Sequence, residues 1–385
     1  MNKYLSSFFL SILFFLLIIP STLAMPVSQL NQVLATDQST KYSYLPVIFN
    51  RFAETYSTNK KFIGIYMAQY WTDDTVATYM PMADNLAAKK HTVSAWFISL
   101  QNIAFTNRQT DNRTNNFYRQ LEALWKKGYI SFVNLQSAAS VNGYEVTDNC
   151  PIPFNADQVA SGSCDKAIEK MATLYAQWIA LGGGRRAFLA PLQEMNGDWV
   201  PYGQTPDNFK QAFQRIQNIF SQKGVTRDQV WWVFAPNGWS DDGHEFINYY
   251  PGNDLVDVVA FSSYNFGYCW FNAPWYRWEN ADTLYEPYIK SFQTIAPKKP
   301  IIISQTGTTS LTANGASNIQ KNQWLESNYQ WLSTSPAVLG VLYFDIPKEC
   351  DWGITTPDET FKSGYKSGAA GYQYLTAQDL QALIK

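Results

Sequence analysis

The sequence predicts an α/β protein with a (β/α)8 barrel fold, and three observations support this. Short apolar segments alternate with longer amphipathic ones, without a low-complexity linker, from about residue 41 to residue 374. Most of the short segments are almost continuously apolar, which is typical of parallel strands covered on both faces. No Gly-x-Gly-x-x-Gly motif or P-loop opens a helical segment, which disfavours an open nucleotide-binding sheet. Strands alternating with helices in one uninterrupted unit favour a closed barrel.

Eight segments have the length and apolar character of barrel strands. In a barrel built from them, catalytic side chains are expected at the C-terminal strand ends. The predicted strands are Phe62–Ala68, Val93–Leu100, Ile130–Leu135, Ala187–Leu192, Val230–Ala235, Val256–Phe261, Ile301–Ser304 and Val338–Phe344.

Helices are predicted between these strands from apolar residues at helical spacing. Thr205 is a suitable N-cap for the helix that begins at Pro206. The predicted helices are Leu45–Tyr56, Asn115–Lys127, Asp165–Leu181, Pro206–Gln222, Asp282–Ile295 and Gln320–Leu332.

The N-terminus has the features of a secretory signal peptide. Lys3 precedes an apolar run over Phe8–Ile19, and small residues lead up to Ala24. We therefore expect residues 1–24 to be a signal peptide and residues 25–385 to form the barrel domain of an extracellular or periplasmic protein. The run is short for a membrane span, and an uncleaved anchor is the alternative.

The chain has four cysteines, an even number that suits disulfides in an exported protein. We predict two bridges, one local and one joining the loops after two strands, out of three possible connectivities; four free thiols in a reducing compartment are the alternative. The predicted pairs are Cys150–Cys164 and Cys269–Cys350.

Charge and histidine content exclude several kinds of function. The formal net charge is -2 and long charge runs are absent, which argues against nucleic acid or an anionic membrane surface as the main partner. The two histidines, His91 and His244, are far apart in sequence, which disfavours a His-based zinc site or a Ser-His-Asp triad. We expect a monomer that needs no metal or cofactor and contacts no membrane beyond its export signal.

The segment Pro191–Trp199, at the end of the fourth predicted strand, is the strongest candidate site. Glu194 can protonate a glycosidic oxygen, Gln193 and Asn196 can bind hydroxyl groups, and Trp199 can stack on a sugar ring. The other strand ends are also polar or aromatic, as expected for a neutral, polyhydroxylated ligand such as a polysaccharide or oligosaccharide. They carry Tyr70-Trp71, Gln101-Asn102, Gln136, Asn237, Trp239, Tyr264-Asn265, Gln305 and Asp345.

Several segments, in order along the chain, resemble glycoside hydrolase family 26, whose members are mainly β-mannanases. The resemblance covers most of the mature chain and implies a (β/α)8 barrel with Glu194 as the general acid/base. It implies substrate contacts for Gln193, Asn196, Trp199, Tyr202, Asn237, Trp239, Tyr264, Asp345 and Trp352, with Trp199 and Trp352 as stacking platforms. The matching segments are Glu194–Gly197 with Trp199, Trp232–Asn237, Tyr249–Asp254 with Tyr264-Asn265, Lys299–Ile301 with Thr306-Gly307, and Tyr343–Asp345 with Asp351-Trp352.

Two positions depart from the family pattern. The family's histidine before the acid/base is Gln193 here, and the family's nucleophilic glutamate is Gln305. A retaining glycosidase needs two carboxyl groups, one of which attacks the anomeric carbon, and a neutral amide is a poor nucleophile. The resemblance therefore identifies the nucleophile position without supplying the nucleophile.

Three functions remain open from the sequence. The first is a hydrolase of β-1,4-linked polysaccharide, most plausibly mannan, that uses another carboxylate: Asp345, or Glu349 or Asp351 in the next loop. The second is a hydrolase of 2-acetamido sugars in which the substrate supplies the nucleophile and Gln305 orients it. The third is a carbohydrate-binding pseudoenzyme with an aromatic groove formed by Trp71, Trp199, Tyr202, Trp239, Tyr264 and Trp270.

Overall fold

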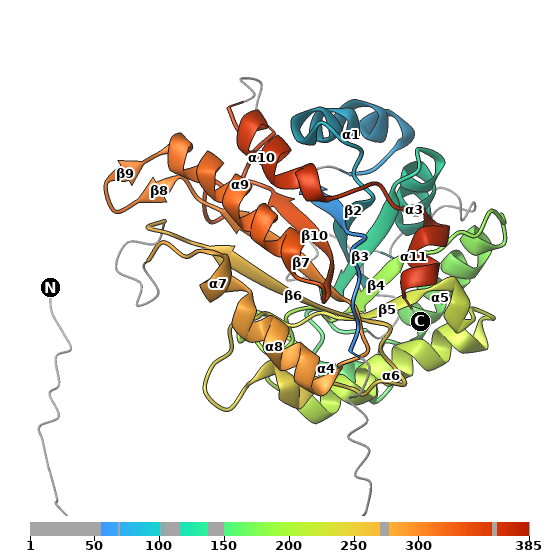
Figure 1. The fold of residues 1–385 in the computed structure, drawn as a ribbon. Coiled ribbons are helices and arrows are strands. Elements are labelled where there is room, and N and C mark those ends of the chain that lie inside the picture. Colours follow the sequence, from blue (N-terminus) through green and yellow to red (C-terminus); the bar gives the residue numbers. More distant parts are fainter. Residues whose placement is uncertain are drawn as a thin grey trace, which may run out of the picture. The chain divides into compact units, whose positions relative to one another are not determined.

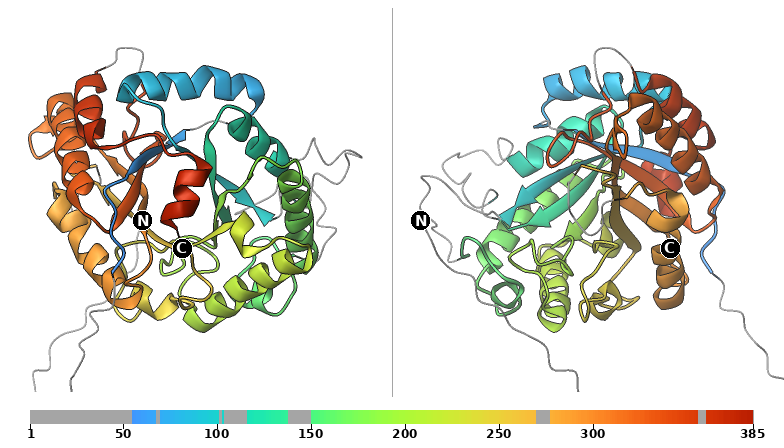
Figure 2. Two further views of the ribbon diagram at one scale, coloured as in Figure 1. Left: turned by 45° about the vertical axis from the view of Figure 1, so that its right-hand side comes forward. Right: turned by 90° about the vertical axis from the view of Figure 1, so that its left-hand side faces the viewer.

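Eight parallel strands close into a barrel in the computed structural model, with helices packed around it (Figures 1 and 2). The structure describes residues 55–67, 70–100, 103, 116–137, 150–269, 277–355 and 360–384. Around the barrel the strand order is β1-β10-β7-β6-β5-β4-β3-β2. The barrel strands are β1 (Phe62–Met67), β2 (Val93–Ser99), β3 (Ile130–Gln136), β4 (Phe188–Pro191), β5 (Trp231–Phe234), β6 (Val258–Asn265), β7 (Ile301–Thr308) and β10 (Val338–Asp345).

Helices connect the strands, and a small hairpin formed by β8 (Leu311–Thr312) and β9 (Gly315–Ala316) follows β7. The α-helices are α1 (Asp73–Ala87), α3 (Asn116–Lys126), α4 (Ala156–Ala160), α5 (Asp165–Ile179), α6 (Pro206–Gln222), α7 (Ala281–Leu284), α8 (Glu286–Ile295), α9 (Asn318–Thr334), α10 (Lys362–Gly368) and α11 (Ala377–Leu383). Short 3-10 turns lie at η4 (Arg227–Gln229), η5 (Phe246–Tyr249) and η6 (Ala369–Gly371).

The predicted barrel is confirmed, and all eight predicted strands are present. The largest differences are at the C-terminal ends of β6 and β7, which continue to Asn265 and Thr308, four residues beyond the predicted ends. The prediction ended each strand where its apolar run ended. In the structure, buried polar side chains such as Ser262 and Gln305 extend these strands to the end of the barrel where the site lies.

The helix predictions were less complete. The segment predicted as one helix over Asp282–Ile295 is divided into α7 and α8, because Pro287 lies in the first turn of a new helix and disfavours helical geometry before it. Helix α1 was not predicted, although Thr72 and Thr75 form a capping box at its start. Helices α10 and α11 were also missed. The predicted helix Leu45–Tyr56 and the predicted signal peptide lie outside the described residues, except that residues 55 and 56 have no regular structure.

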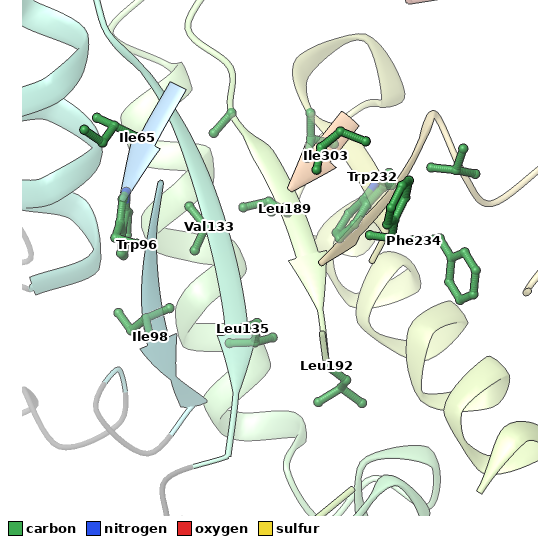
Figure 3. Packing of buried hydrophobic residues seen from close by; sticks show 14 of the residues in the cluster. Ile65, Trp96, Ile98, Val133, Leu135, Leu189, Leu192, Trp232, Phe234 and Ile303 are labelled. Atoms are coloured by element: carbon green, nitrogen blue, oxygen red, sulfur yellow. The ribbon is translucent and has the colours of Figure 1, made fainter. Parts of the chain in front are cut away.

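The core has two layers, one inside the barrel and one between the strands and the helices. Trp231 packs inside against Phe188, with ring centroids 4.6 Å apart, whereas its neighbour Trp232 packs outside against Phe220 at 5.2 Å. This alternation follows from strand geometry, in which successive side chains point to opposite faces of the sheet. Figure 3 shows the outer layer, where Trp232, Leu189 and Val133 come from neighbouring strands.

The chain's C-terminal segment covers the N-terminal end of the barrel. Leu375, Leu380 and Ile384 are buried in the same cluster as Phe62 at the start of β1. The backbone N–H of Leu375 donates a hydrogen bond to Thr92 Oγ1 at 2.8 Å. Figure 2 shows helix α11 within the ring of surrounding helices. The site is therefore expected at the opposite end of the barrel, which holds the C-terminal ends of the strands.

Both predicted disulfides are present: Cys150–Cys164 before α5, and Cys269–Cys350 between the loops after β6 and β10. Within the described part of the chain, no helix is long and apolar enough to cross a membrane. The same residues contain no cluster of three or more His, Cys, Asp or Glu side chains arranged to hold a metal ion.

Candidate active site

Glu194 lies at the C-terminal end of β4, and its carboxylate is held by three side-chain donors. Oε1 accepts hydrogen bonds from Asn237 Nδ2 at 3.1 Å and from the Ser262 hydroxyl, and Oε2 accepts one from Trp199 Nε1 at 2.9 Å. The backbone has a positive φ of 56° at Glu194, and its N–H donates to the Ala235 carbonyl at 2.8 Å. Such a conformation is uncommon for a non-glycine residue and often occurs at functional sites. The carboxylate is thus fixed in position.

Asn196 joins the loops that carry Glu194 and Asn237. Its Nδ2 donates to the carbonyls of Asn237 and Trp239, both at 3.0 Å, and to Ser240 Oγ at 2.8 Å. Its Oδ1 accepts a hydrogen bond from the Asn237 N–H at 2.8 Å. The side chain is fully buried. The resemblance implied that Asn196 contacts substrate; in this structure its amide is committed to the scaffold, so it positions Asn237.

Gln305 is buried on β7, and both ends of its amide are hydrogen-bonded. Nε2 donates to Gln193 Oε1 at 3.0 Å, and Oε1 accepts from the Tyr264 hydroxyl at 2.9 Å. Burial raises the pKa of Tyr264 well above its usual value, and the charge of Glu194 raises it further. Tyr264 therefore remains a neutral hydroxyl donor. The result is an uncharged Gln193–Gln305–Tyr264 chain where the sequence resemblance leads us to expect the nucleophile.

Trp199, which donates to Glu194, stacks on Trp239, and both side chains are exposed. Their rings are nearly parallel, with an interplanar angle of 24° and centroids 6.2 Å apart, and about half of each side chain is exposed. Gly197 permits this arrangement, because a Cβ at that position would lie 2.4 Å from the Trp199 ring. The pair forms a platform suited to stacking on sugar rings.

Three aromatic residues predicted to line the groove are instead buried. Trp352 is 1% exposed and packs on Tyr264 with ring centroids 5.2 Å apart, so its face is covered in this conformation. Tyr202 is equally buried, and its hydroxyl donates to the Gln193 carbonyl at 3.0 Å. Trp71 is fully buried in the outer core. Gln101, Asn102 and Trp270 lie outside the described residues.

Asp345, the carboxylate first considered as a replacement anion, is occupied by the loop that follows β10. Its Oδ1 accepts hydrogen bonds from the N–H groups of Ile354 at 2.5 Å and Thr355 at 3.2 Å, and its Oδ2 accepts one from the Thr355 hydroxyl. Burial raises the pKa of Asp345, while these hydrogen bonds oppose the rise. Asp345 thus fastens the loop that follows β10.

The structure adds two residues that the sequence analysis missed. Ser262 bonds Glu194 directly, and it lies on the same strand face as the inward-pointing Val258 and Ala260. That alternation was a detectable signal, because a polar residue on the inner face of a barrel strand near its C-terminal end points toward the site. Tyr66 on β1 is the second. Its hydroxyl accepts a hydrogen bond from Asn134 Nδ2 at 2.6 Å, and the charge of Glu194 contributes to raising its pKa.

A cleft of about 280 Å³ lies beside Tyr66, at the ends of β1 and β2. Tyr70, Phe97 and Gln120 also line it. Aromatic rings and an amide match the chemistry of a saccharide, which offers apolar ring faces and many hydroxyl groups.

Comparisons with known proteins show similarity to one family of glycoside hydrolases. The model of "Glycosyl hydrolase family 26" matches residues 158–300. Endoglucanase H of Acetivibrio thermocellus is 28% identical over 233 residues, 57% of this chain and 24% of that protein. A mannan endo-1,4-beta-mannosidase of Bacillus subtilis is 28% identical over 163 residues, 37% of this chain and 42% of that protein. The matched part of the chain thus spans about a quarter of the length of endoglucanase H and under half of the length of the mannosidase.

Solved structures share the fold. A family 26 β-mannanase from Bacteroides ovatus has a TM-score of 0.57 at 16% identity and covers 85% of this chain and 93% of its own. A β-mannanase from a protist symbiont of the termite Reticulitermes speratus has a TM-score of 0.55 at 15% identity. The match covers 84% of this chain and 90% of that protein's chain. The family model over residues 158–300, the sequence relatives and the barrel thus agree in making this chain similar to glycosyl hydrolase family 26.

Proposed function

We propose that this protein is a secreted glycoside hydrolase that cleaves β-1,4-linked polysaccharide, with mannan as its leading substrate. One observation carries the proposal: the Glu194 carboxylate is held by Trp199, Asn237 and Ser262 beside an exposed tryptophan platform. A pure binding protein has little need for a positioned carboxylic acid. The mannosidase names of several relatives support mannan, and endoglucanase H makes β-glucan the next substrate to test.

Glu194 acts as the general acid in this proposal. Its protonated carboxyl group gives a proton to the glycosidic oxygen as the bond to the anomeric carbon breaks. Asn237 and Ser262 hold Oε1, and the Trp199 N–H holds Oε2, so the group is already oriented before the sugar binds. Trp199 and Trp239 would stack on the neighbouring sugar rings and keep the bond beside the acid.

Two disulfides support export, because such bridges form and persist in oxidising compartments. We therefore place the protein outside the cytoplasm, with the polysaccharide as its partner.

The neutral Gln193–Gln305 contact favours a second candidate, a glycan-binding pseudoenzyme. An amide pair binds hydroxyl groups well but supplies no anion to attack or stabilise an oxocarbenium-like transition state.

Hydrolysis of a panel of mannan, glucomannan, mixed-linkage glucan, xylan and chitin by wild type and Glu194→Ala tests the proposal. We expect wild type to release reducing ends from mannan and Glu194→Ala to release none. Binding of a glycan without any cleavage would overturn the hydrolase and support the pseudoenzyme. Cleavage of chitin alone would indicate the substrate-assisted route instead.

A further inference from the structure

A hydrolase with Gln305 at the nucleophile position needs a second carboxylate from elsewhere in the chain, unless the substrate itself supplies the nucleophile. The sequence offers three on β10 and the loop after it: Asp345, Glu349 and Asp351. The inference below identifies one of them and rests on the hydrolase function proposed above.

Asp345 and Asp351 are both committed to holding the loop. Asp345 bonds Ile354 and Thr355, as described above. Asp351 Oδ1 accepts hydrogen bonds from the Thr309 hydroxyl and, at 3.0 Å, from the Ser310 N–H, and its Oδ2 lies 4.0 Å from Lys321 Nζ. Burial alone would raise the pKa of Asp351, but these partners bring it below its usual value. Both the Asp345 and the Asp351 carboxylates thus accept hydrogen bonds from groups within the protein.

Glu349 is placed differently. Its side chain is one-third exposed, so water can reach the carboxylate, as it can that of Asp351, whose side chain is 47% exposed; the difference is that Glu349 contacts Trp352. Oε2 lies 3.4 Å from Trp352 Nε1, and Trp352 packs against Tyr264, whose hydroxyl bonds Gln305. Two contacts thus connect Glu349 to the ring beside the nucleophile position.

The charge of Glu349 also acts on Tyr264. Burial has the largest effect on the pKa of Tyr264, and the charges of both Glu194 and Glu349 raise it further. These are the two carboxylates that act on Tyr264. In an inverting two-carboxylate glycosidase, the acid and the base lie on opposite sides of the sugar and leave room between them for a water molecule.

The loop around Glu349 is held in place, although its ion pair is exposed. The Cys269–Cys350 disulfide joins the next residue to the loop after β6, and Cys269 Sγ lies 3.3 Å from the Glu349 carbonyl oxygen. Lys348 pairs with Oε1 at 2.6 Å, but its own side chain is 66% exposed. Such a surface pair is weak and can yield when a sugar enters.

We propose that Glu349 is the general base of an inverting hydrolysis. Its carboxylate takes a proton from a water molecule while the water oxygen forms the new bond to the anomeric carbon. Glu194 gives its proton to the glycosidic oxygen, and the bond between that oxygen and the anomeric carbon breaks. The products are a free sugar of inverted configuration and a free hydroxyl on the leaving chain; Glu349 ends protonated and Glu194 ionised, and exchange with solvent restores both.

Glu349→Gln, assayed on the glycan that wild type cleaves, tests this role. We expect kcat to fall roughly 100-fold or more with little change in KM, because general-base catalysis commonly contributes factors of this size. NMR of fresh wild-type product should show the inverted anomer. The matched control is Glu286→Gln on α8, another exposed glutamate paired with a lysine, at 2.6 Å from Lys290, which should keep the wild-type rate.

Rescue of activity by azide distinguishes a general base from a residue with a purely structural role. With Glu349→Ala, azide can attack the anomeric carbon without losing a proton, so cleavage should recover and give a glycosyl azide of inverted configuration. A retained wild-type product, or Glu349→Gln within tenfold of wild type, would overturn this inference and leave the hydrolase standing. Wild type inert on every glycan would instead overturn the proposed function itself.

Discussion

Gln305 donates a hydrogen bond from Nε2 to Oε1 of Gln193 at 3.0 Å, so the two residues that depart from the family pattern are in direct contact. Both side chains are at most 5% exposed. If only one of the two positions were an amide, that amide would face a histidine or a carboxylate, a side chain that can carry a charge, in a buried place. Two amides satisfy each other, because each offers both a donor and an acceptor. The pair is therefore a coherent, uncharged arrangement rather than two unrelated losses.

The contact predicts how the site responds when the family carboxylate is restored. In Gln305→Glu, the Gln193 amide can rotate to turn its Nε2 toward the new carboxylate, so we expect the variant to fold. The new anion can attack the anomeric carbon, and the product should change from the inverted to the retained anomer, measured by NMR. Gln193→His with Gln305→Glu should behave in the same way. An unchanged product anomer and rate in both variants would contradict this account of the site.

The Trp199 ring has two roles, and substitution can separate them. Trp199→Phe keeps an aromatic face but removes the N–H that donates to Glu194 Oε2. A hydrogen bond to a charged group contributes about 1.5–3 kcal/mol, so kcat should fall roughly 10- to 100-fold. KM should change little in Trp199→Phe and rise in Trp199→Ala, which also removes the stacking surface. Equal KM values in the two variants would mean that the ring does not stack on substrate.

Much of the fold followed from the sequence, whereas the functions of individual site residues followed less well. Continuous apolar strands predicted the barrel, and the motif around Glu194 predicted a carboxylate at the C-terminal end of β4. Sequence pattern could not separate Asn196, with four hydrogen bonds inside the protein, from Asn237, which contacts Glu194. Both are amides at strand ends, and only the fold determines which of them is enclosed. The burial of Trp352, expected to be a stacking platform, was not foreseen for the same reason, because it depends on Tyr264 from a distant strand.

Asn196→Ala should therefore reduce stability as well as activity. The change removes the Asn196 Nδ2 group, which donates to the carbonyls of Asn237 and Trp239 and to Ser240 Oγ. It also removes Oδ1, so the Asn237 N–H loses its side-chain acceptor. We expect a loss of about 2–3 kcal/mol in the free energy of unfolding, measured by urea denaturation. Activity should fall too, because Asn237 holds Glu194. Full stability with lost glycan binding would show instead that Asn196 contacts the sugar.

The two disulfides should differ in their effects. Cys269 and Cys350 are 81 residues apart, and Cys150 and Cys164 are 14 apart. In the chain-entropy model, the longer closed loop contributes about 4.5 kcal/mol and the shorter about 3 kcal/mol. Double serine variants of each pair, compared by urea unfolding, should follow that order. The long-range variant should also lower kcat, because it frees the loop that carries Glu349, and equal kcat values in both variants would contradict that link.

The buried Lys61 predicts a pH dependence of stability. Its side chain is 2% exposed, its Nζ donates to the carbonyls of Ser335 and, at 2.7 Å, Val338, and burial lowers its pKa to about 8. Between pH 8 and about 10 the unfolded chain holds this proton and the folded chain has lost it. Unfolding then takes up a proton, so stability should rise with pH by up to about 1.4 kcal/mol per pH unit.

Lys61→Met should flatten this rise without abolishing it, because burial also lowers the pKa of Lys321 to about 8. The measurement is the free energy of unfolding in urea at several pH values from 7 to 10. Lys60→Met, at the exposed neighbouring position, is the matched control and should keep the wild-type slope. Identical slopes in wild type and Lys61→Met would mean that Lys61 keeps its proton in the folded protein throughout this range. Its two carbonyl partners would then stabilise the ammonium more strongly than burial destabilises it.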